Sequence, residues 1–303
     1  MLGSKIKSSV HGWLILDKPI GLTSTQAIGK ARRLLGGKKV GHGGTLDPLA
    51  TGILPLAFGE ATKLIPYIMD GDKAYEFTIC WGEQRSTDDA EGEVVKTSAK
   101  RPATDEIRTA LPHFTGRVQQ TPPAFSAIKL QGIRAYDIAR RGGTPDLVAR
   151  EVIIHALELL KTPDPNHAIF RASCGKGMYV RSLARDLATM LGTCGYIAAL
   201  RRTQVGIFGF DQTITLTKLE ELQKSGAAAS ALLPLQAALG DIPTLSLTAA
   251  EAERLRAGQG ILIKPQQLDL IEKPLIFTEY QGVPVALAEP KAGEFRTVRG
   301  FHF

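Results

Sequence analysis

Asp47 is the one acid before Glu60 in the glycine-rich stretch GHGGTLDPLATGILPLAFGEATKL at residues 41–64. Aspartate before proline is a preferred helix N-cap, so the simplest interpretation is that Asp47 caps one helical turn, which Gly52 ends. The glycines upstream remain unexplained, because they let another backbone approach closely. The apolar run ILPLAF predicts a buried strand that anchors this loop. A lone acid in such a place is suited to chemistry in a cleft.

Positive charge lies beside this loop. Between Lys30 and His42 the chain has five Lys or Arg residues and no acid. A solvated helix face is the commoner explanation of such a run, and an edge that contacts phosphates is the alternative. The net charge of +7 is compatible with a polyanionic partner without requiring one.

Local patterns predict the elements that must position Asp47. A capping box of Thr23 and Gln26 opens a helix that runs to Leu35. Alternation of apolar and polar residues predicts a half-buried strand at 75–81. Further predicted elements are a strand at 12–16, helices at 104–114 and 178–192, a strand at 168–174, an Ala-rich connector at 225–240, and a helix from Thr248 to Ala257.

Composition limits the class of protein. The chain has 303 residues, 44% of them hydrophobic and 22% charged, which is typical of a folded protein of about two domains. Its cysteines, Cys80, Cys174 and Cys194, are few and widely spaced, as expected in a reducing cytosol. The apolar run WLIL near the N-terminus is too short for a signal peptide, and no run approaches the ~20 residues of a membrane helix. We therefore expect a cytoplasmic protein.

Several reaction classes lack their motifs. There is no Walker A and no G-x-G-x-x-G sequence, which argues against a nucleotide-dependent enzyme. There is no C-x-x-C pair for zinc, and no acidic cluster with metal spacing accompanies Asp47, which argues against a metal-dependent nuclease.

Beyond Asp47, five further blocks occur in the order found in one family. They are LDKPIGLTS (16–24), KAYEFTICWGEQRSTDDAEG (73–92), PPAFSAIKLQGIRAYDIARRG (122–142), CGKGMYVRSLARDLATMLG (174–192) and LRRTQVGIF (200–208). With the Asp47 segment they resemble the bacterial tRNA pseudouridine-55 synthases, the TruB family, over most of residues 12–210. The tail from about residue 244 resembles the small PUA-like domain of these enzymes.

The resemblance implies a fold and a reaction. It implies an α+β pseudouridine-synthase fold, in which helices flank a mixed, largely antiparallel sheet. The implied catalytic domain spans 10–240, with an RNA-binding insertion at about 120–152, and a small PUA-like β domain spans 244–303. The implied reaction flips uridine 55 out of the T loop of tRNA, detaches uracil from its ribose and rejoins it through C5. No cofactor and no metal are implied.

The resemblance also implies residue roles. Asp47 is the catalytic aspartate, acting as nucleophile on ribose C1′ or as a base, and Arg181 pairs with it. Tyr75 stacks against the flipped uracil and is a candidate base for C5, although its strand position alone favours a core aromatic. The implied substrate-binding residues are His42, Tyr179, Leu200 and Lys18, where Lys18 either orders the catalytic loop or meets a phosphate. The implied RNA-backbone contacts are Lys38, Lys39, Lys129, Arg134, Arg140 and Arg141.

Two positions depart from the pattern of many family members. Met178 stands where Thr is common, which removes a side-chain oxygen from the start of the predicted helix. Gly43 also stands where Thr is common, which predicts a looser loop.

Two alternatives of other kinds fit part of the pattern. An RNA-binding or RNA-folding protein would share the basic charge, but it has no need for Asp47, Tyr75 and Arg181 together. A guide-RNA-dependent pseudouridine synthase would need protein partners and a fuller C-terminal domain than 244–303. We expect a monomer that binds the tRNA elbow without an obligate protein partner.

Overall fold

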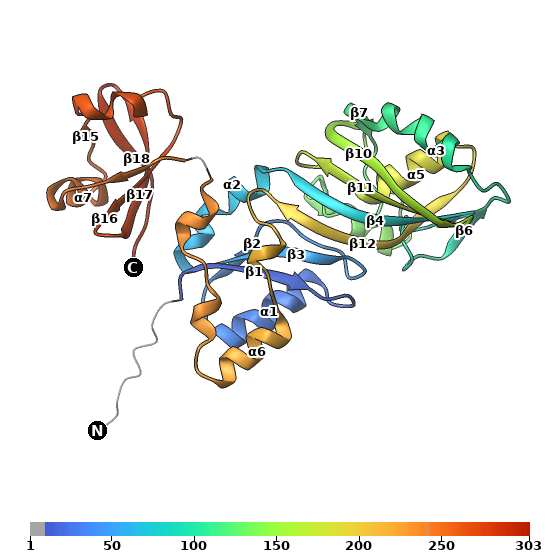
Figure 1. Ribbon diagram of the computed structural model, residues 1–303, viewed down its shortest axis with the longest axis horizontal. Coiled ribbons are helices and arrows are strands. Elements are labelled where there is room, and N and C mark those ends of the chain that lie inside the picture. Colours follow the sequence, from blue (N-terminus) through green and yellow to red (C-terminus); the bar gives the residue numbers. More distant parts are fainter. Residues whose placement is uncertain (1–9, 241) are drawn as a thin grey trace.

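The structure is a computed structural model that describes residues 10–240 and 242–303. The N-terminal stretch considered above as a targeting segment lies outside the described residues up to residue 9. Two β-sheets organise the described chain, one of nine strands and one of five, and they lie at opposite ends of the molecule (Figure 1).

The larger sheet is mixed. Its order is β13-β1-β3-β12-β4-β11-β10-β7, with β2 on β3. Two of its pairs, β1 with β13 and β3 with β12, are parallel, and the other neighbours are antiparallel. Its strands are β1 (Gly12–Lys18), β2 (Val40–His42), β3 (Thr51–Phe58), β4 (Lys73–Trp81), β7 (Gly116–Gln120), β10 (Arg150–Asp164), β11 (His167–Cys174), β12 (Gly195–Val205) and β13 (Ile214–Thr215). The expected mixed, largely antiparallel sheet is confirmed.

Helices pack on this sheet and connect its strands. They are α1 (Ser24–Leu35), α2 (Ile65–Asp70), α3 (Thr104–Ala110), α4 (Ala135–Arg140), α5 (Val180–Met190) and α6 (Leu216–Lys224). Short 3-10 turns are η1 (Gly59–Leu64), η2 (Leu111–Phe114), η3 (Phe210–Gln212), η4 (Ala228–Ala231) and η5 (Leu235–Ala238). Two small hairpins pair β5 (Glu83–Arg85) with β6 (Val94–Thr97), and β8 (Lys129–Leu130) with β9 (Ile133–Arg134).

Helix α1 forms as its sequence predicts. The Thr23 hydroxyl accepts the Gln26 N–H and the Gln26 side chain accepts the Thr23 N–H, so the capping box is complete. Gly36 ends the helix with φ of 72°, a left-handed conformation that glycine adopts without strain.

Two hydrophobic cores flank the catalytic end of the large sheet. One joins α5 to β4 and β11, and includes Phe77, Phe170 and Leu187. The other joins α1 and α6 to β1 and β3, and includes Leu16 and Leu54. Their shared boundary lies at β12, where Leu200 packs against both.

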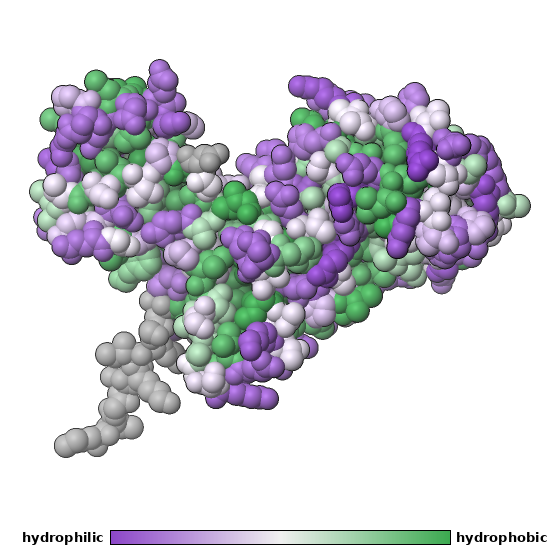
Figure 2. Space-filling view, in the orientation of Figure 1, coloured by the Kyte–Doolittle hydropathy of each residue, from purple (hydrophilic) through white to green (hydrophobic). Residues whose placement is uncertain are grey.

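The second sheet belongs to the C-terminal unit. Its order is β14-β16-β17-β18-β15. Its elements are β14 (Thr244–Ser246), α7 (Ala249–Arg256), β15 (Ile261–Leu262), η6 (Pro265–Leu270), β16 (Ile276–Tyr280), β17 (Val283–Lys291) and β18 (Glu294–Gly300). A notch separates this unit from the β10 side of the large sheet in the space-filling view (Figure 2). The expected C-terminal β domain is confirmed as a β-rich unit.

Candidate active site

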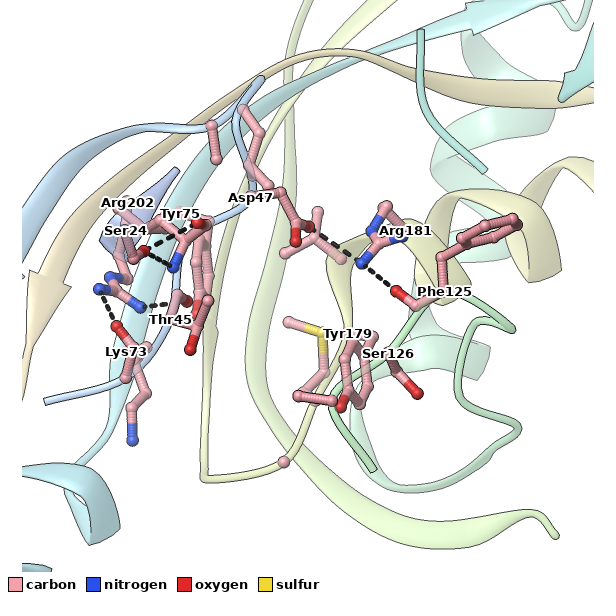
Figure 3. A pocket seen from close by; sticks show the side chains of 18 of the residues that line it. Ser24, Thr45, Asp47, Lys73, Tyr75, Phe125, Ser126, Tyr179, Arg181 and Arg202 are labelled. Atoms are coloured by element: carbon pink, nitrogen blue, oxygen red, sulfur yellow. Dashed lines mark hydrogen bonds and ion pairs between the residues drawn. The ribbon is translucent and has the colours of Figure 1, made fainter. Parts of the chain in front are cut away.

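A cavity of about 1170 Å³ opens beside the middle of the large sheet. The loop that carries Asp47 forms one wall, and the start of α5 forms the wall that faces it (Figure 3). Residues of β4 and β12 line the cavity between these walls, and the segment after β7, with Phe125 and Ser126, covers one side. Residues from most of the sequence blocks described above therefore line one cavity.

Asp47 lies on a turn and not on a helix. The expected helical turn is wrong, because residues 48–50 form only a bend closed by the Ala50 N–H, which donates to the Asp47 carbonyl at 3.1 Å. The buried Ser24 hydroxyl holds the neighbouring residue: it accepts the Leu46 N–H at 2.8 Å and donates to the Leu46 carbonyl at 2.9 Å. With the backbone fixed in this way, the Asp47 carboxylate is 38% exposed and directed across the cavity.

Arg181 meets that carboxylate from the opposite wall. Its Nη2 lies 3.0 Å from Asp47 Oδ2, and its side chain is only 7% exposed. The guanidinium also donates to the carbonyls of Thr87 at 3.0 Å and Phe125 at 2.9 Å. Its Nε lies 3.7 Å from the buried Asp89 carboxylate. These partners fix the orientation of the guanidinium toward Asp47, and its charge stabilises the ionised carboxylate.

Asp89 was not among the residues selected from the sequence. It lies in the acidic loop after β5 and is 3% exposed. An acid within the KAYEFTICWGEQRSTDDAEG block was the available signal, but two adjacent aspartates look alike in sequence. The structure separates them, since Asp88 instead pairs with Arg185 at 3.0 Å.

Gln120 compensates for Met178 at the start of α5. The helix begins one residue after Tyr179, which has no side-chain cap. The buried Gln120 amide accepts the Tyr179 N–H at 2.8 Å and donates to the Tyr179 carbonyl at 3.1 Å. A residue of β7 therefore fixes the backbone of the residue before the helix through two hydrogen bonds, and Tyr179 lines the cavity.

Tyr75 and Leu200 lie on neighbouring strands of the cavity. Both pack partly against the α5 core and both line the cavity, so the core and pocket interpretations of Tyr75 both hold. Burial raises the pKa of the Tyr75 phenol, and the charge of Arg202 opposes that rise. The phenol is therefore protonated near neutral pH.

Lys18 lies inside the fold and is not among the residues that line the cavity. Its side chain is fully buried, and Nζ donates to the carbonyls of Pro19 at 3.0 Å, Leu22 at 2.7 Å and Pro48 at 3.4 Å. Burial lowers the pKa of Lys18 to about 8, although Asp47 and Glu91 act to raise it. A phosphate contact does not fit these bonds, and ordering of the loop after Asp47 does.

His42 lines the cavity at the end of β2. Its Nδ1 is buried and has no hydrogen-bond partner among the described residues, and burial lowers the pKa of the ring. Burial therefore favours the neutral imidazole at this cavity wall, and a backbone hydrogen bond with Gly44 opposes that effect. The neighbouring Gly43 is packed tightly, since a Cβ there would lie 2.7 Å from Ile68 Cγ2, so the expected looser loop is wrong at this residue.

The six predicted RNA-backbone residues are all exposed but fall into two groups. Lys38 and Lys39 lie between α1 and β2, outside the cavity wall. The other four belong to the segment between β7 and β10, and two of them, Arg134 and Arg140, line the cavity. Their guanidinium carbons lie 5.8 and 5.3 Å from the Tyr136 ring centroid, so this face presents an aromatic ring between two cations.

The described residues contain neither a metal-binding cluster nor a membrane-spanning helix. No group of three or more His, Cys, Asp or Glu side chains in residues 10–240 and 242–303 is arranged to hold a metal ion. In the same residues, no helix combines the length and apolar character needed to cross a bilayer.

Sequence comparisons give consistent results over the whole chain. Residues 32–180 match the TruB family pseudouridylate synthase (N terminal domain) model, and residues 181–240 match the tRNA pseudouridylate synthase B C-terminal domain model. The tRNA pseudouridine synthase B of Bradyrhizobium diazoefficiens is 50% identical over 98% of this chain and 87% of its own. The protein of the same name from Caulobacter vibrioides is 48% identical over 99% of both chains.

Solved structures of low identity share the fold. A chain of the crystal structure of a Cbf5-Nop10-Gar1 complex superposes with a TM-score of 0.71 at 22% identity, covering 96% of this chain and 84% of that chain. A chain of an H/ACA RNP bound to a substrate RNA gives a TM-score of 0.70 at 20% identity, covering 97% and 86%. With the family models and the full-length relatives, the chain belongs to the TruB family of pseudouridylate synthases.

Proposed function

We propose that this protein isomerises uridine 55 in the T loop of tRNA to pseudouridine. The observation that carries the proposal is the Asp47–Arg181 ion pair, which spans a large cavity walled by elements far apart in sequence. Relatives about half identical over nearly the whole chain are named tRNA pseudouridine synthase B. A buried guanidinium holds this carboxylate in one orientation at the cavity, as glycosidic chemistry requires.

The reaction conserves atoms and electrons. The N1–C1′ bond breaks, a C5–C1′ bond forms, C5 loses a proton and N1 gains one. Asp47 acts on the ribose, either by attacking C1′ or by removing a proton to give a glycal-like intermediate. Both routes need an ionised carboxylate, which Arg181 stabilises. The balanced isomerisation requires no external oxidant or reductant.

The other cavity residues hold the base. The target uridine must leave its stack to reach Asp47. Tyr75 offers an aromatic face, and Leu200 and Tyr179 complete an apolar pocket. Because the Tyr75 phenol is protonated, we assign it stacking in preference to removal of the C5 proton. We assign to His42, which lines the cavity, a contact with the displaced T loop.

The rest of the chain binds the tRNA backbone. We assign residues 10–240 to the catalytic domain, with the RNA-binding insertion at about 120–152, and 244–303 to the PUA-like domain. The matched family models end at residue 240, in agreement with that boundary. Contacts from the six exposed basic residues are to phosphate and sugar, so they position the T arm without reading its sequence. We place the enzyme in the cytoplasm as a monomer without an obligate protein partner.

The test follows tritium released from C5 of labelled uridine in an unmodified tRNA transcript. Wild type is expected to release tritium from the T-loop uridine. Asp47→Asn is expected to lower the rate by about 1,000-fold or more, because the amide cannot serve as nucleophile or base, while tRNA affinity persists. The matched control is Asp70→Asn, which removes another cavity-lining carboxylate, one paired with Lys176. Its rate should stay within about twofold of wild type, as for an exposed ion pair.

Two results would decide against the proposal. Binding of tRNA without tritium release by wild type would indicate an RNA-binding protein. Release that is equal for wild type and Asp47→Asn would remove Asp47 from the mechanism.

A further inference from the structure

A buried arginine that the sequence analysis did not select lies beneath the catalytic loop. Arg202, on β12, is 2% exposed. Its Nε donates to the Ile53 carbonyl at 2.8 Å, Nη1 to the Thr45 carbonyl at 3.3 Å and Nη2 to the Gly44 carbonyl at 3.0 Å (Figure 3). Two of these carbonyls precede Asp47 and one follows it. A single guanidinium therefore holds both ends of the loop that carries the carboxylate.

The backbone of Arg202 closes the same loop. In the β3–β12 register Arg202 lies opposite Gly52, whose φ is +98°. A Cβ on Gly52 would lie only 2.2 Å from the Arg202 carbonyl oxygen. Only glycine fits this approach, so both the side chain and the backbone of Arg202 determine where the Asp47 loop returns to the sheet.

The positive charge of Arg202 is buried close to the proposed catalytic residues. Burying a cation is costly unless a partner compensates it, and in the described part of the chain Arg202 forms no ion pair. Burial opposes the charge of Arg202, and the Asp47 carboxylate favours it. On the paired strand β4 it lies opposite Tyr75, and the cations Lys18 and Lys73 also feel its field unfavourably. If residue 202 only filled space in the fold, an apolar side chain there would give a more stable protein than a buried cation.

We propose that Arg202 is a positioning residue for pseudouridine formation, which holds the Asp47 loop and Tyr75 in the arrangement that the reaction needs. The inference rests on the proposed function. It assigns Arg202 no contact with the reacting atoms: the residue acts through the carbonyls of the loop and through Tyr75. A displacement of Asp47 by about 1 Å can cost a rate factor of about 100.

The test compares the single-turnover kinetics of two Arg202 variants with those of a control variant at the neighbouring residue. Arg202→Met removes the charge and all three donors, and is expected to lower the rate constant by about 100-fold. Arg202→Lys keeps a charge and part of the hydrogen bonding, so a smaller loss of about 10-fold is expected. The matched control is Arg201→Lys, at the preceding residue of β12, where the arginine is 41% exposed and pairs with Asp17. It should stay within about twofold of wild type.

The amplitude of the single-turnover reaction, which is the fraction of tRNA converted, distinguishes a positioning role of Arg202 from a role in stability alone. If Arg202 positions the loop, both variants should convert nearly all of the tRNA slowly, with tRNA affinity within about twofold of wild type. If Arg202 only stabilises the fold, the amplitude should fall with the inactive fraction while the rate constant of the active fraction stays near wild type. That result overturns the proposal.

The remaining outcomes are also decisive. If Arg202→Lys does not fold, Arg202→Met carries the test, since apolar replacement of a buried charge is often tolerated. Failure of both to fold assigns Arg202 to stability and overturns the proposal. An inactive wild type overturns the proposed function, whereas active wild type and equally active Arg202 variants overturn only this inference.

Discussion

At the scale of single residues, the charged groups of the site differ in how deeply they are buried. Asp47 keeps a partly exposed carboxylate at the cavity, whereas Arg181 and Arg202 are buried and held by backbone carbonyls. A buried guanidinium with fixed donors needs no rearrangement to meet a negative charge, which is the electrostatic preorganisation that enzymes use. Lys18 adds a buried ammonium whose bonds are all to carbonyls of the surrounding turns.

The pH dependence of the free energy of unfolding should reveal the lowered pKa of Lys18. Its pKa is about 8 in the folded protein against an ordinary value of 10.5, so the unfolded chain binds more protons between these limits. Raising the pH from about 8 to 10.5 should therefore stabilise wild type relative to Lys18→Met, by at most about 1.4 kcal/mol per pH unit. Below pH 8 the difference should be constant. Urea unfolding at several pH values measures it.

The exposed Lys96→Met on β6 is the control for this series, with a difference from wild type that should not change with pH. A flat difference for Lys18→Met as well would mean that Lys18 is not buried as a cation in solution.

At the scale of elements, α5 links the catalytic wall to the segment after β7. Gln120 holds the helix start, and three side chains of the first turns of α5, Arg181, Ser182 and Arg185, donate to carbonyls of that segment. The start of the proposed RNA-binding insertion is therefore bonded to the same helix that supplies the partner of Asp47. Placement of the insertion and placement of Arg181 are consequences of one set of contacts.

Gln120→Ala should weaken this link. The variant leaves the Tyr179 N–H without its partner, while the Tyr179 carbonyl keeps the Leu183 N–H, so a loss of about 1–3 kcal/mol in the free energy of unfolding is expected. Urea unfolding followed by circular dichroism measures it. Gln119→Ala is the matched control, because Gln119 is the adjacent residue of β7 and is exposed. Equal stability of the two variants would show that the Gln120 amide does not cap α5.

At the scale of the whole molecule, the two sheets share a hydrophobic cluster. Phe277, Leu287 and Phe301 of the C-terminal unit pack with Trp13 and Phe208 of the larger unit. Two hydrogen bonds accompany this contact: the Lys63 ammonium donates to the Gly300 carbonyl at 2.7 Å, and the His302 N–H donates to Glu60 at 2.9 Å. The C-terminal unit is thus held against the sheet and is not merely tethered by the connector.

Phe301→Ala should therefore destabilise both units together. Phe301 is 2% exposed, and truncation of a buried phenylalanine costs about 3–5 kcal/mol. Thermal and urea unfolding of the full chain measure the loss. Val298→Ala, on β18 three residues before Phe301 and 45% exposed, is the control and should change stability by about 0.5 kcal/mol or less. An effect of Phe301→Ala as small as that of the control would mean that the cluster does not form in solution.

Local patterns predicted those elements whose cause is local. The Thr23–Gln26 capping box, the alternation at 75–81 and the second capping box at Thr248 all gave elements where expected, because neighbouring residues satisfy those hydrogen bonds and faces. The long strand β10 and the strand β12 were not predicted, since their pairing partners are distant in sequence. The start of α5 was misplaced by two residues, because its capping group comes from β7.

The sequence by itself determined the family, the mixed α and β composition and the carboxylate at the centre of the chemistry, because these depend on residue types and their order. Only the tertiary structure decided that Asp47 lies on a turn, that Lys18 faces inward, and that Asp89, Gln120 and Arg202 support the site. The physical reason is the same in each case. A buried polar group must find its partner wherever the fold provides one, and here the partners of Gln120 and Arg202, and one partner each of Lys18 and Asp89, are 30 to 158 residues away along the chain.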